Sequence, residues 1–216
     1  MGHLKRISYF YVTFILALLT ILALPVAIGQ FQAGQNDIIA YYPMDGDVND
    51  SSGNGHHGTV YGYPKKVKDR FGNENKAYGF DGVDDYMVFP VGEHQQIAIS
   101  LWFNSYSSYA PPVVVDYGDD CIKAKVDYIS GATPAQFKIH FYPFRGGVLK
   151  SYSKLDYQVW HHLYIDVGTP QQAPRLFVDG MFDREGTEMF TFQPEDGNMF
   201  IGRTSDSNKI YHFYFY

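Results

Sequence analysis

The stretch Ile97–Asn104, which reads IAISLWFN, decides how the chain folds because its side chains alternate in character. The odd-numbered positions are all large and apolar, whereas the even-numbered positions between them are mixed. Successive side chains of a β-strand point to opposite faces of the sheet, so this period of two predicts a strand with one buried face. The stretch Phe137–Phe141 (FKIHF) repeats the pattern, with lysine and histidine on its second face.

Similar runs, separated by turn residues, recur along the chain after residue 37, and no long stretch there has the period of a helix. The predicted strands are Ile38–Tyr42, Thr59–Tyr63, Lys76–Phe80, Tyr86–Phe89, Ile97–Asn104, Pro112–Tyr117, Ile122–Tyr128, Gln136–Phe141, Val148–Tyr152, Trp160–Val167, Arg175–Val178, Met181–Glu185 and Asn198–Gly202. Asp179-Gly180 between two of these runs predicts a tight hairpin, since both central positions of a type I′ turn need positive φ. Many short strands at this spacing predict an all-β sandwich or barrel.

The composition agrees with a β-rich domain and excludes one class of partner. Aromatic residues make up 18% of the chain, and they suit the half-buried surface of a pleated sheet. The formal net charge is −6, which argues against nucleic-acid binding because phosphate contacts need a basic patch. The single cysteine, Cys121, can form no disulfide within the chain, so the fold must rest on its apolar core.

The first 29 residues have the organisation of a secretory signal helix. Lys5 and Arg6 precede the apolar run Ile7–Leu24, and Ala27 and Gly29 are the small residues of a cleavage site. We therefore expect cleavage after residue 29. The alternative is an uncleaved signal anchor, which is the only contact with a membrane that the sequence predicts.

The predicted domain organisation follows from this cleavage site. Residues 1–29 are the signal peptide or anchor, residues 30–37 are a polar linker, and residues 38–216 are the domain. In either case the positive end of the signal stays inside the cell. The domain is therefore expected to be extracytoplasmic, either secreted or at the cell surface.

Several segments resemble, in the same order, the motifs of one known family. They include a Phe-Asp-Gly-x-x-Asp-Tyr turn and a Trp-His-His strand, and they are Ile39–Gly46, Asn49–Thr59, Phe80–Tyr86, Ile99–Phe103, Trp160–Leu163, Leu176–Gly180 and Phe200–Arg203. The family is that of the laminin-G-like jelly-roll domains in the concanavalin-A-like lectin/glucanase superfamily. The resemblance implies a two-sheet antiparallel jelly-roll sandwich, but it does not imply a ligand, because one fold hosts many functions.

The end of the chain departs from the family pattern. Members of the family close with a strand of the form Gly-x-Ile-Asp-Glu-Val-Arg-Ile-Tyr, whereas here the aromatic run Tyr211–Tyr216 stands after Arg203 and Ile210. The domain is therefore expected to lack its last strand, which would leave a sheet edge exposed. Truncation is favoured over the alternative that Tyr211–Tyr216 pairs in place of the lost strand.

The loop Asp45–Gly58 is rich in oxygen-bearing side chains and glycines, which is the composition of a calcium site. Calcium takes 6–8 oxygen ligands, and the resemblance implies that some relatives hold a structural calcium near this loop. Asp50 and Asn54 are the predicted ligands. The alternative is an Asx-rich turn without metal. The acidic run Asp81–Asp85 can add ligands, although a turn between strands is the preferred interpretation.

The residue types that carry catalysis are not arranged in any motif for it. His161 and His162 are neighbours and point to opposite faces of a strand, so they cannot hold one metal ion together. One is expected to be buried and hydrogen-bonded, and the other exposed. Glycoside cleavage needs two placed carboxylates, and neither the Glu-x-Asp-x-x-Glu motif of related glucanases nor a Gly-x-Ser-x-Gly motif is found. The sequence predicts no catalytic residues and no enzyme.

Sugar binding needs exposed aromatic faces beside polar groups. Tyr106 and Tyr109 lie among serines, and Tyr142 lies close to an Arg-Gly-Gly loop, so these three are the predicted ligand-binding residues. Trp102 and Trp160 are expected in the core. The sequence therefore predicts an exported, lectin-like carbohydrate-binding module with calcium as a structural cofactor. The alternatives are an adhesive protein-interaction domain of a cell-surface protein and a glycan hydrolase, so the expected partner is a glycan or an extracellular protein.

Overall fold

The computed structural model describes residues 38–106, 113–118, 122–131, 136–143, 149–187, 194, 196–204, 207–210 and 212–215. It describes the backbone alone at residues 113, 128, 137, 139, 141–143, 204, 207–210 and 212–215. The predicted signal and linker, residues 1–37, lie outside these ranges. All regular secondary structure in the described ranges is β-strand, and no helix among these residues is long and apolar enough to cross a membrane.

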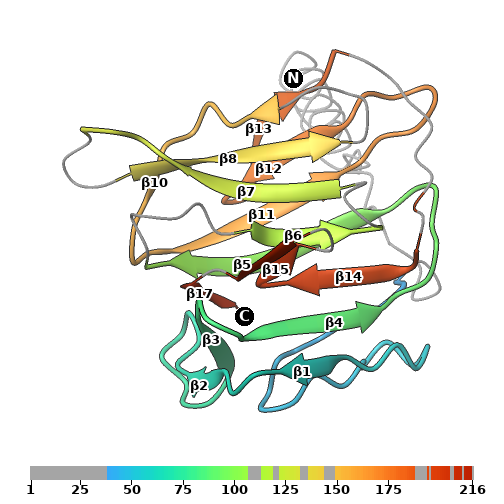
Figure 1. Ribbon diagram of the computed structural model, residues 1–216. Coiled ribbons are helices and arrows are strands. Elements are labelled where there is room, and N and C mark those ends of the chain that lie inside the picture. The colour runs from blue at the N-terminus through green and yellow to red at the C-terminus, as the bar shows by residue number, and fades with distance from the viewer. Residues whose placement is uncertain are drawn as a thin grey trace, which may run out of the picture. The chain divides into compact units, whose positions relative to one another are not determined.

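Two antiparallel sheets make up the domain, and they confirm the predicted sandwich (Figure 1). The eight-stranded sheet contains, in spatial order, β1 (Thr59–Tyr61), β4 (Tyr86–Pro90), β14 (Asn198–Ile201), β6 (Val113–Tyr117), β7 (Ile122–Tyr128), β8 (Gln136–Pro143) and β10 (Leu155–Asp156), with β9 (Leu149–Lys150) also paired to β8. The seven-stranded sheet contains β13 (Met181–Glu185), β12 (Arg175–Val178), β11 (Trp160–Asp166), β5 (Ala98–Ser105), β17 (His212–Phe215), β3 (Ala77–Asp81) and β2 (Lys65–Val67). A separate pair is formed by β15 (Arg203–Thr204) and β16 (Ser207–Ile210).

The inward side chains of both sheets form one buried apolar cluster. Leu163 in the middle of β11 pairs with Leu101 of β5 on one side and with Val178 of β12 on the other, and all three are buried. Burying an aliphatic side chain of this size contributes about 1.5–3 kcal/mol. Burial alternates along β11 residue by residue, as the period of two in the sequence predicts.

Most predicted strands are present, with ends that differ by a few residues. The hairpin between β12 and β13 is confirmed, because Asp179 and Gly180 both have positive φ, at 51° and 77°, and Val178 pairs with Met181. The sequence did not indicate the short strands β2, β10, β15 and β16. Strands of two to four residues offer too few positions for alternation to be visible.

The predicted first strand, Ile38–Tyr42, is not a strand in the structure. Polar side chains from the glycine-rich loop, rather than a neighbouring strand, bind its backbone. The amide of Asn54 donates to the carbonyls of Ile38 and Ile39, at 2.8 and 3.0 Å, and the N–H of Tyr41 donates to Asp50 at 3.0 Å. These side chains, with the backbone N–H of Ser51 that donates to the Tyr41 carbonyl at 2.8 Å, take the place of a sheet ladder for part of this segment.

Asp50 is the centre of this loop. Its buried carboxylate accepts hydrogen bonds from the backbone N–H groups of Tyr41, Ser52 and His56 and from the Ser52 hydroxyl, all at 2.8–3.0 Å. Burial alone would raise the pKa of Asp50, but these hydrogen bonds outweigh it and hold the pKa below its ordinary value. The charged carboxylate therefore organises Ile38–Gly58 around itself.

The aromatic run at the end of the sequence is part of the seven-stranded sheet. Its residues His212–Phe215 form β17, which lies between β5 and β3, and Phe213 pairs with Ser105 on one side and with Phe80 on the other. The backbone of this run therefore pairs within the sheet, which was the less favoured of the two alternatives. Figure 1 shows β17 between β5 and β3.

The Asp50 arrangement predicts a large effect of a small substitution. Asp50→Ala should lower the free energy of unfolding by about 2 kcal/mol or more, because three backbone N–H groups lose a charged acceptor. Since the folded-state pKa lies below the unfolded value, this stabilisation should be complete above the ordinary aspartate range and fall away as the pH drops below it.

Urea unfolding at pH 7 and at pH 3 measures both effects. Asp47→Ala is the matched control, because the exposed Asp47 carboxylate accepts one local bond, from the N–H of Asn49 at 3.0 Å. Equal stability of the two variants would contradict the proposed role of Asp50.

Candidate functional site

The outer face of the seven-stranded sheet carries an unusual number of aromatic side chains. Because the inward residues of β5, β11 and β12 fill the core, their neighbours in sequence must point outward. Pairing across the strands places Ser100, Tyr164, Phe177 and Phe182 in one row. We define the aromatic face as the outward residues Ser100, Trp102, His162, Tyr164, Phe177 and Phe182.

The rings of the aromatic face contact one another in order. Tyr164 and Phe177 meet edge to face at 5.5 Å between centroids, and so do Phe177 and Phe182. Trp102 and His162 are tilted against each other at 5.1 Å. Such pairs are worth about 0.5–1.5 kcal/mol each beyond their burial, so they hold the rings in fixed orientations.

Trp102 corrects a prediction made from the sequence. Both Trp102 and Trp160 were expected in the core, but they lie at outward positions and are partly exposed. The even-numbered positions of β5 point away from the core, and this parity outweighs the general preference of large apolar side chains for burial. The alternation that identified the strand also indicates that Trp102 points outward.

An arginine closes one end of the aromatic face. The guanidinium of Arg70 lies 4.2 Å from the ring centre of Trp102 and 4.0 Å from that of Phe71, whose side chain is 66% exposed. The buried Asp69 fixes this loop by accepting the N–H groups of Phe71 and Asn73, at 2.8 and 2.9 Å. Cation–π contacts of this kind are worth about 0.5–2 kcal/mol.

Polar groups lie among the rings of the aromatic face. The Ser100 hydroxyl and His162 Nε2 are 2.9 Å apart, and Arg175 donates to Asp166 at 2.6 Å on the next row of β11 and β12. Burial lowers the pKa of His162, opposed by the charge of Asp179 and assisted by that of Arg70. The imidazole is therefore neutral at pH 7, with one nitrogen that donates and one that accepts.

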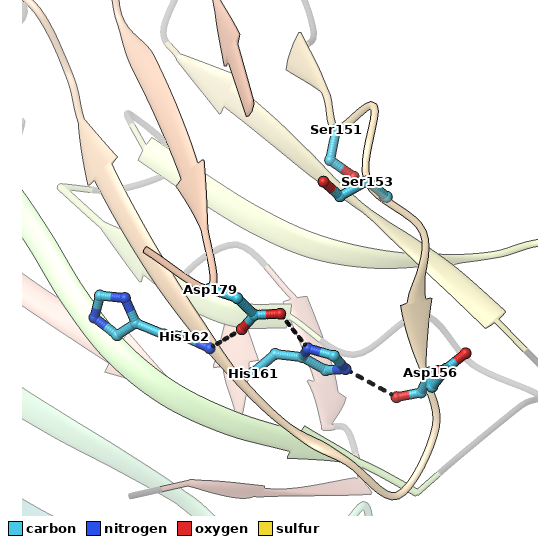
Figure 2. Close-up of polar contacts among 6 residues, drawn as sticks. All are labelled: Ser151, Ser153, Asp156, His161, His162 and Asp179. Atoms are coloured by element: carbon cyan, nitrogen blue, oxygen red, sulfur yellow. Dashed lines mark hydrogen bonds and ion pairs between the residues drawn. The ribbon is translucent and has the colours of Figure 1, made fainter. Parts of the chain in front are cut away.

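His161 lies on the opposite, inward side of β11, where its ring contacts two neighbouring segments. It is buried, and its Nδ1 lies 2.8 Å from Asp179 Oδ2 while its Nε2 lies 3.1 Å from the Asp156 carbonyl. The other Asp179 oxygen accepts the backbone N–H of His162 at 2.8 Å. Figure 2 shows the two rings on opposite sides of the strand. The predicted buried and hydrogen-bonded histidine is His161, whereas His162 points outward but is only partly exposed.

This arrangement does not assemble a nucleophilic triad around Ser100. A catalytic triad needs a carboxylate on the imidazole that contacts the hydroxyl. Here the Asp179 carboxylate contacts the ring of His161. The ring of His162 contacts Ser100, but it is the backbone N–H of His162, not its ring, that donates to Asp179. The pair is therefore suited to binding hydroxyl groups rather than to activating a nucleophile.

The predicted ligand-binding tyrosines are only partly within the described residues. Tyr106 directly follows β5 and is 40% exposed. Tyr109 lies outside the described residues. The backbone of Tyr142 belongs to β8 and pairs with Lys123, on the other sheet from β5. The three tyrosines therefore stay predictions, and Tyr106 and Tyr142 do not belong to the same sheet, because Tyr106 follows a strand of the seven-stranded sheet and Tyr142 is in the eight-stranded one.

The predicted calcium ligands have other partners in the structure. Asp50 accepts three hydrogen bonds from its own loop and one from the N–H of Tyr41, and the Asn54 amide donates to two carbonyls. Calcium at these residues stays a prediction. The acidic turn does bring ligand atoms of Asp81, Asp84 and Asp85 within 4.8 Å of one another. Asp85 in this turn also accepts hydrogen bonds from the backbone N–H groups of Asp81, at 3.0 Å, and Tyr63, at 2.7 Å. These bonds fit the preferred interpretation of Asp81–Asp85 as a turn between strands.

Comparisons with known proteins agree with the fold. No protein-family model and no curated protein matches the sequence. Among solved structures, the chain is similar to domain 4 of AbnA, a GH43 extracellular arabinanase from Geobacillus stearothermophilus, in complex with arabinotriose. The two share 17% identity with a TM-score of 0.58, over 82% of this chain and 88% of that one.

The chain is also similar to binding domains of toxins. The receptor binding domain of a botulinum neurotoxin C/D mosaic serotype matches 85% of this chain with a TM-score of 0.53 and 11% identity. The binding domain of Paraclostridial Mosquitocidal Protein 1 matches 77% of it with a TM-score of 0.53 and 13% identity. This chain spans less than half of these two domains, at 48% and 44%.

The chain is a β-sandwich domain. The similarities establish the fold at this level, and they are too remote to assign a ligand.

Asp179 should be the most sensitive position beneath the aromatic face. Asp179→Ala is expected to lower the free energy of unfolding by about 2–3 kcal/mol, because it leaves buried His161 without its charged partner. Asp179→Asn should cost less, since asparagine tolerates the positive φ and keeps an acceptor oxygen. Asp156→Ala is the control, because His161 contacts the carbonyl of Asp156 and not its side chain. Urea unfolding gives the ranking, and a control as unstable as Asp179→Ala would refute it.

Proposed function

We propose that this chain is an exported, non-catalytic module of the laminin-G-like jelly-roll type that binds carbohydrate. The observation that carries the proposal is the aromatic face. A sugar ring presents an apolar C–H surface that stacks on aromatic rings, and its hydroxyl groups need polar partners beside them. The aromatic face offers both, in fixed geometry, on the rigid strands β5, β11 and β12.

The polar groups on this face suit neutral hydroxyls. The Ser100 hydroxyl and the neutral His162 imidazole each supply a donor and an acceptor, 2.9 Å apart. Asp166 and Arg175 on the adjacent row can accept and donate in the same way. Because the rings and their partners are already held by contacts with one another, little ordering entropy is lost on binding.

The similar proteins support this proposal in outline. The arabinanase domain matches over most of both chains and was solved with arabinotriose, and the toxin domains are receptor-binding or binding domains. The names of the latter two describe binding, whereas the first is one domain of an enzyme, solved with a saccharide. Export is proposed from the signal-like first 29 residues, and it agrees with the extracellular origin of the arabinanase.

Tryptophan and phenylalanine on the face should dominate the affinity. Trp102→Ala and Phe177→Ala are each expected to weaken binding to a glycan array about tenfold, which corresponds to about 1.4 kcal/mol. Tyr41→Ala is the matched control, because Tyr41 is 54% exposed and lies in the Ile38–Asp50 segment away from the face. Unchanged binding by folded Trp102→Ala and Phe177→Ala variants would refute the role of the face.

A protein partner is the second candidate, favoured by one observation. Met181 and Phe182, at the edge strand β13, are 73% and 58% exposed, and exposed apolar side chains mark protein contacts when they cluster. Substituting Met181→Ser would then weaken binding to an extracellular protein while leaving glycan binding unchanged. The glycan array separates the two functions.

Calcium stays a proposal with its own measurement. If an ion binds the native state only, millimolar calcium should raise the melting temperature above that in chelator. The unaltered protein is the right sample, because Asp50→Ala removes loop hydrogen bonds as well as a ligand. Identical melting in calcium and in chelator would exclude this structural role.

A further inference from the structure

A second group of exposed aromatic residues lies on the other sheet, at its β1 edge. Tyr61 of β1 and Tyr86 of β4 are paired across the strands, and their rings stack in parallel, 4.5 Å apart with 2° between the planes. The Arg203 guanidinium lies 4.7 Å from the ring centre of Tyr86. Tyr61 remains 43% exposed. These three residues and Tyr63 form what we call the tyrosine edge.

Tyr63 is the most exposed large side chain of the tyrosine edge, at 94%. Its backbone is nevertheless held firmly, because its N–H donates to the buried Asp85 carboxylate at 2.7 Å. The preceding residue must be glycine: Gly62 has φ +74°, and a Cβ there would lie 2.5 Å from Asp85 Oδ1. The loop therefore holds an almost fully exposed ring on a fixed backbone.

Asp85 connects the segments that carry Tyr63, Tyr86 and Arg203. Its side chain binds Tyr63, its own residue precedes Tyr86, and its carbonyl lies 3.1 Å from where a Cβ of Gly202 would stand, next to Arg203. Burial raises the pKa of Asp85 against the hydrogen bonds that it accepts from Asp81 and Tyr63. Burying the Asp85 carboxylate costs free energy. Because it holds these segments together, the surface that they form exists before any ligand binds.

The charge beside the tyrosines restricts what can bind there. Asp81 and Asp84 are exposed in the same turn, and a Cβ on Gly62 would lie 2.7 Å from the backbone carbonyl of Asp84. Together with Asp85, these carboxylates outnumber the one guanidinium of the tyrosine edge, that of Arg203, which lies against the ring of Tyr86. Carboxylates accept hydrogen bonds from hydroxyl groups and repel other anions. The chemistry therefore fits a neutral sugar, which stacks on a tyrosine and donates hydroxyls to aspartate, and it disfavours uronic acids and sulfated glycans.

We infer that the tyrosine edge is a second saccharide-binding site, specific for neutral sugars and separate from the aromatic face. The two sites belong to different sheets, so they share none of the defining residues. The inference does not rest on the aromatic face, and either site can fail without the other. Two sites on one module also allow bivalent attachment to a polysaccharide, with the gain in avidity that linked sites bring.

Calorimetric titration of the full chain with neutral linear oligosaccharides tests the inference, with arabinotriose and xylohexaose as probes and oligogalacturonate as the anionic counterpart. In a Trp102→Ala background, neutral saccharide should still bind with a stoichiometry of about one. Adding Tyr63→Ala should weaken this binding about tenfold or more, whereas Tyr63→Phe, which keeps the ring, should retain it. Oligogalacturonate should bind more weakly than the neutral probes.

Tyr152→Ala is the matched control, because Tyr152 is 68% exposed beneath Arg184 at 4.6 Å but follows β9, at the opposite end of the sheet. It should leave the titration unchanged. The inference is overturned if none of the neutral probes binds in the Trp102→Ala background, if Tyr63→Ala has no effect there, or if oligogalacturonate binds better. A Tyr63-dependent site with no effect of Trp102→Ala would uphold this inference and reject the aromatic face.

Discussion

The pairing of Leu163 with Leu101 and Val178 is the contact on which the rest of the structure depends. It joins three neighbouring strands through one buried row, and its register cannot slip by one residue without turning every apolar side chain to water. The same constraint determines the opposite face. Once Leu163 is inward, His162 and Tyr164 must be outward, and the candidate binding surface is a consequence of how the core is packed.

Alternation in sequence was therefore sufficient for the longer strands and for part of the site, but not for the short strands β2, β10, β15 and β16. It identified β5, β8 and β11 and the opposite orientations of His161 and His162, while the turn residues Asp179-Gly180 identified the hairpin. It also predicts that Trp102 points outward, but the general preference of large apolar side chains for burial led to the opposite expectation. The tyrosine edge was not indicated, because Tyr61 and Tyr86 meet only through the pairing of β1 with β4, and no local pattern encodes that contact.

Carboxylates account for much of what alternation could not predict. Asp50, Asp69, Asp85 and Asp183 are buried, and each accepts backbone N–H groups from a segment that lacks a strand partner. In sequence these residues look like solvated or metal-binding acids. Which groups they contact depends on how the chain folds. The structure is therefore needed to tell an aspartate that binds the backbone of a loop from one that binds a cation. An acidic composition can thus reflect internal loop architecture as much as surface charge.

The central place of β17 has a consequence for how the chain acquires its structure. Phe213 pairs with Phe80 and Ser105, so strands made early in synthesis are joined only by a segment made near residue 213. Until that segment emerges, β3 and β5 each have an unsatisfied edge, which is the feature that drives intermolecular pairing. Contacts of such long sequence separation also slow folding. This sheet is therefore completed only after β3, β5 and β17 have all been made, and until then the unpaired edges of β3 and β5 must be kept from pairing with other chains.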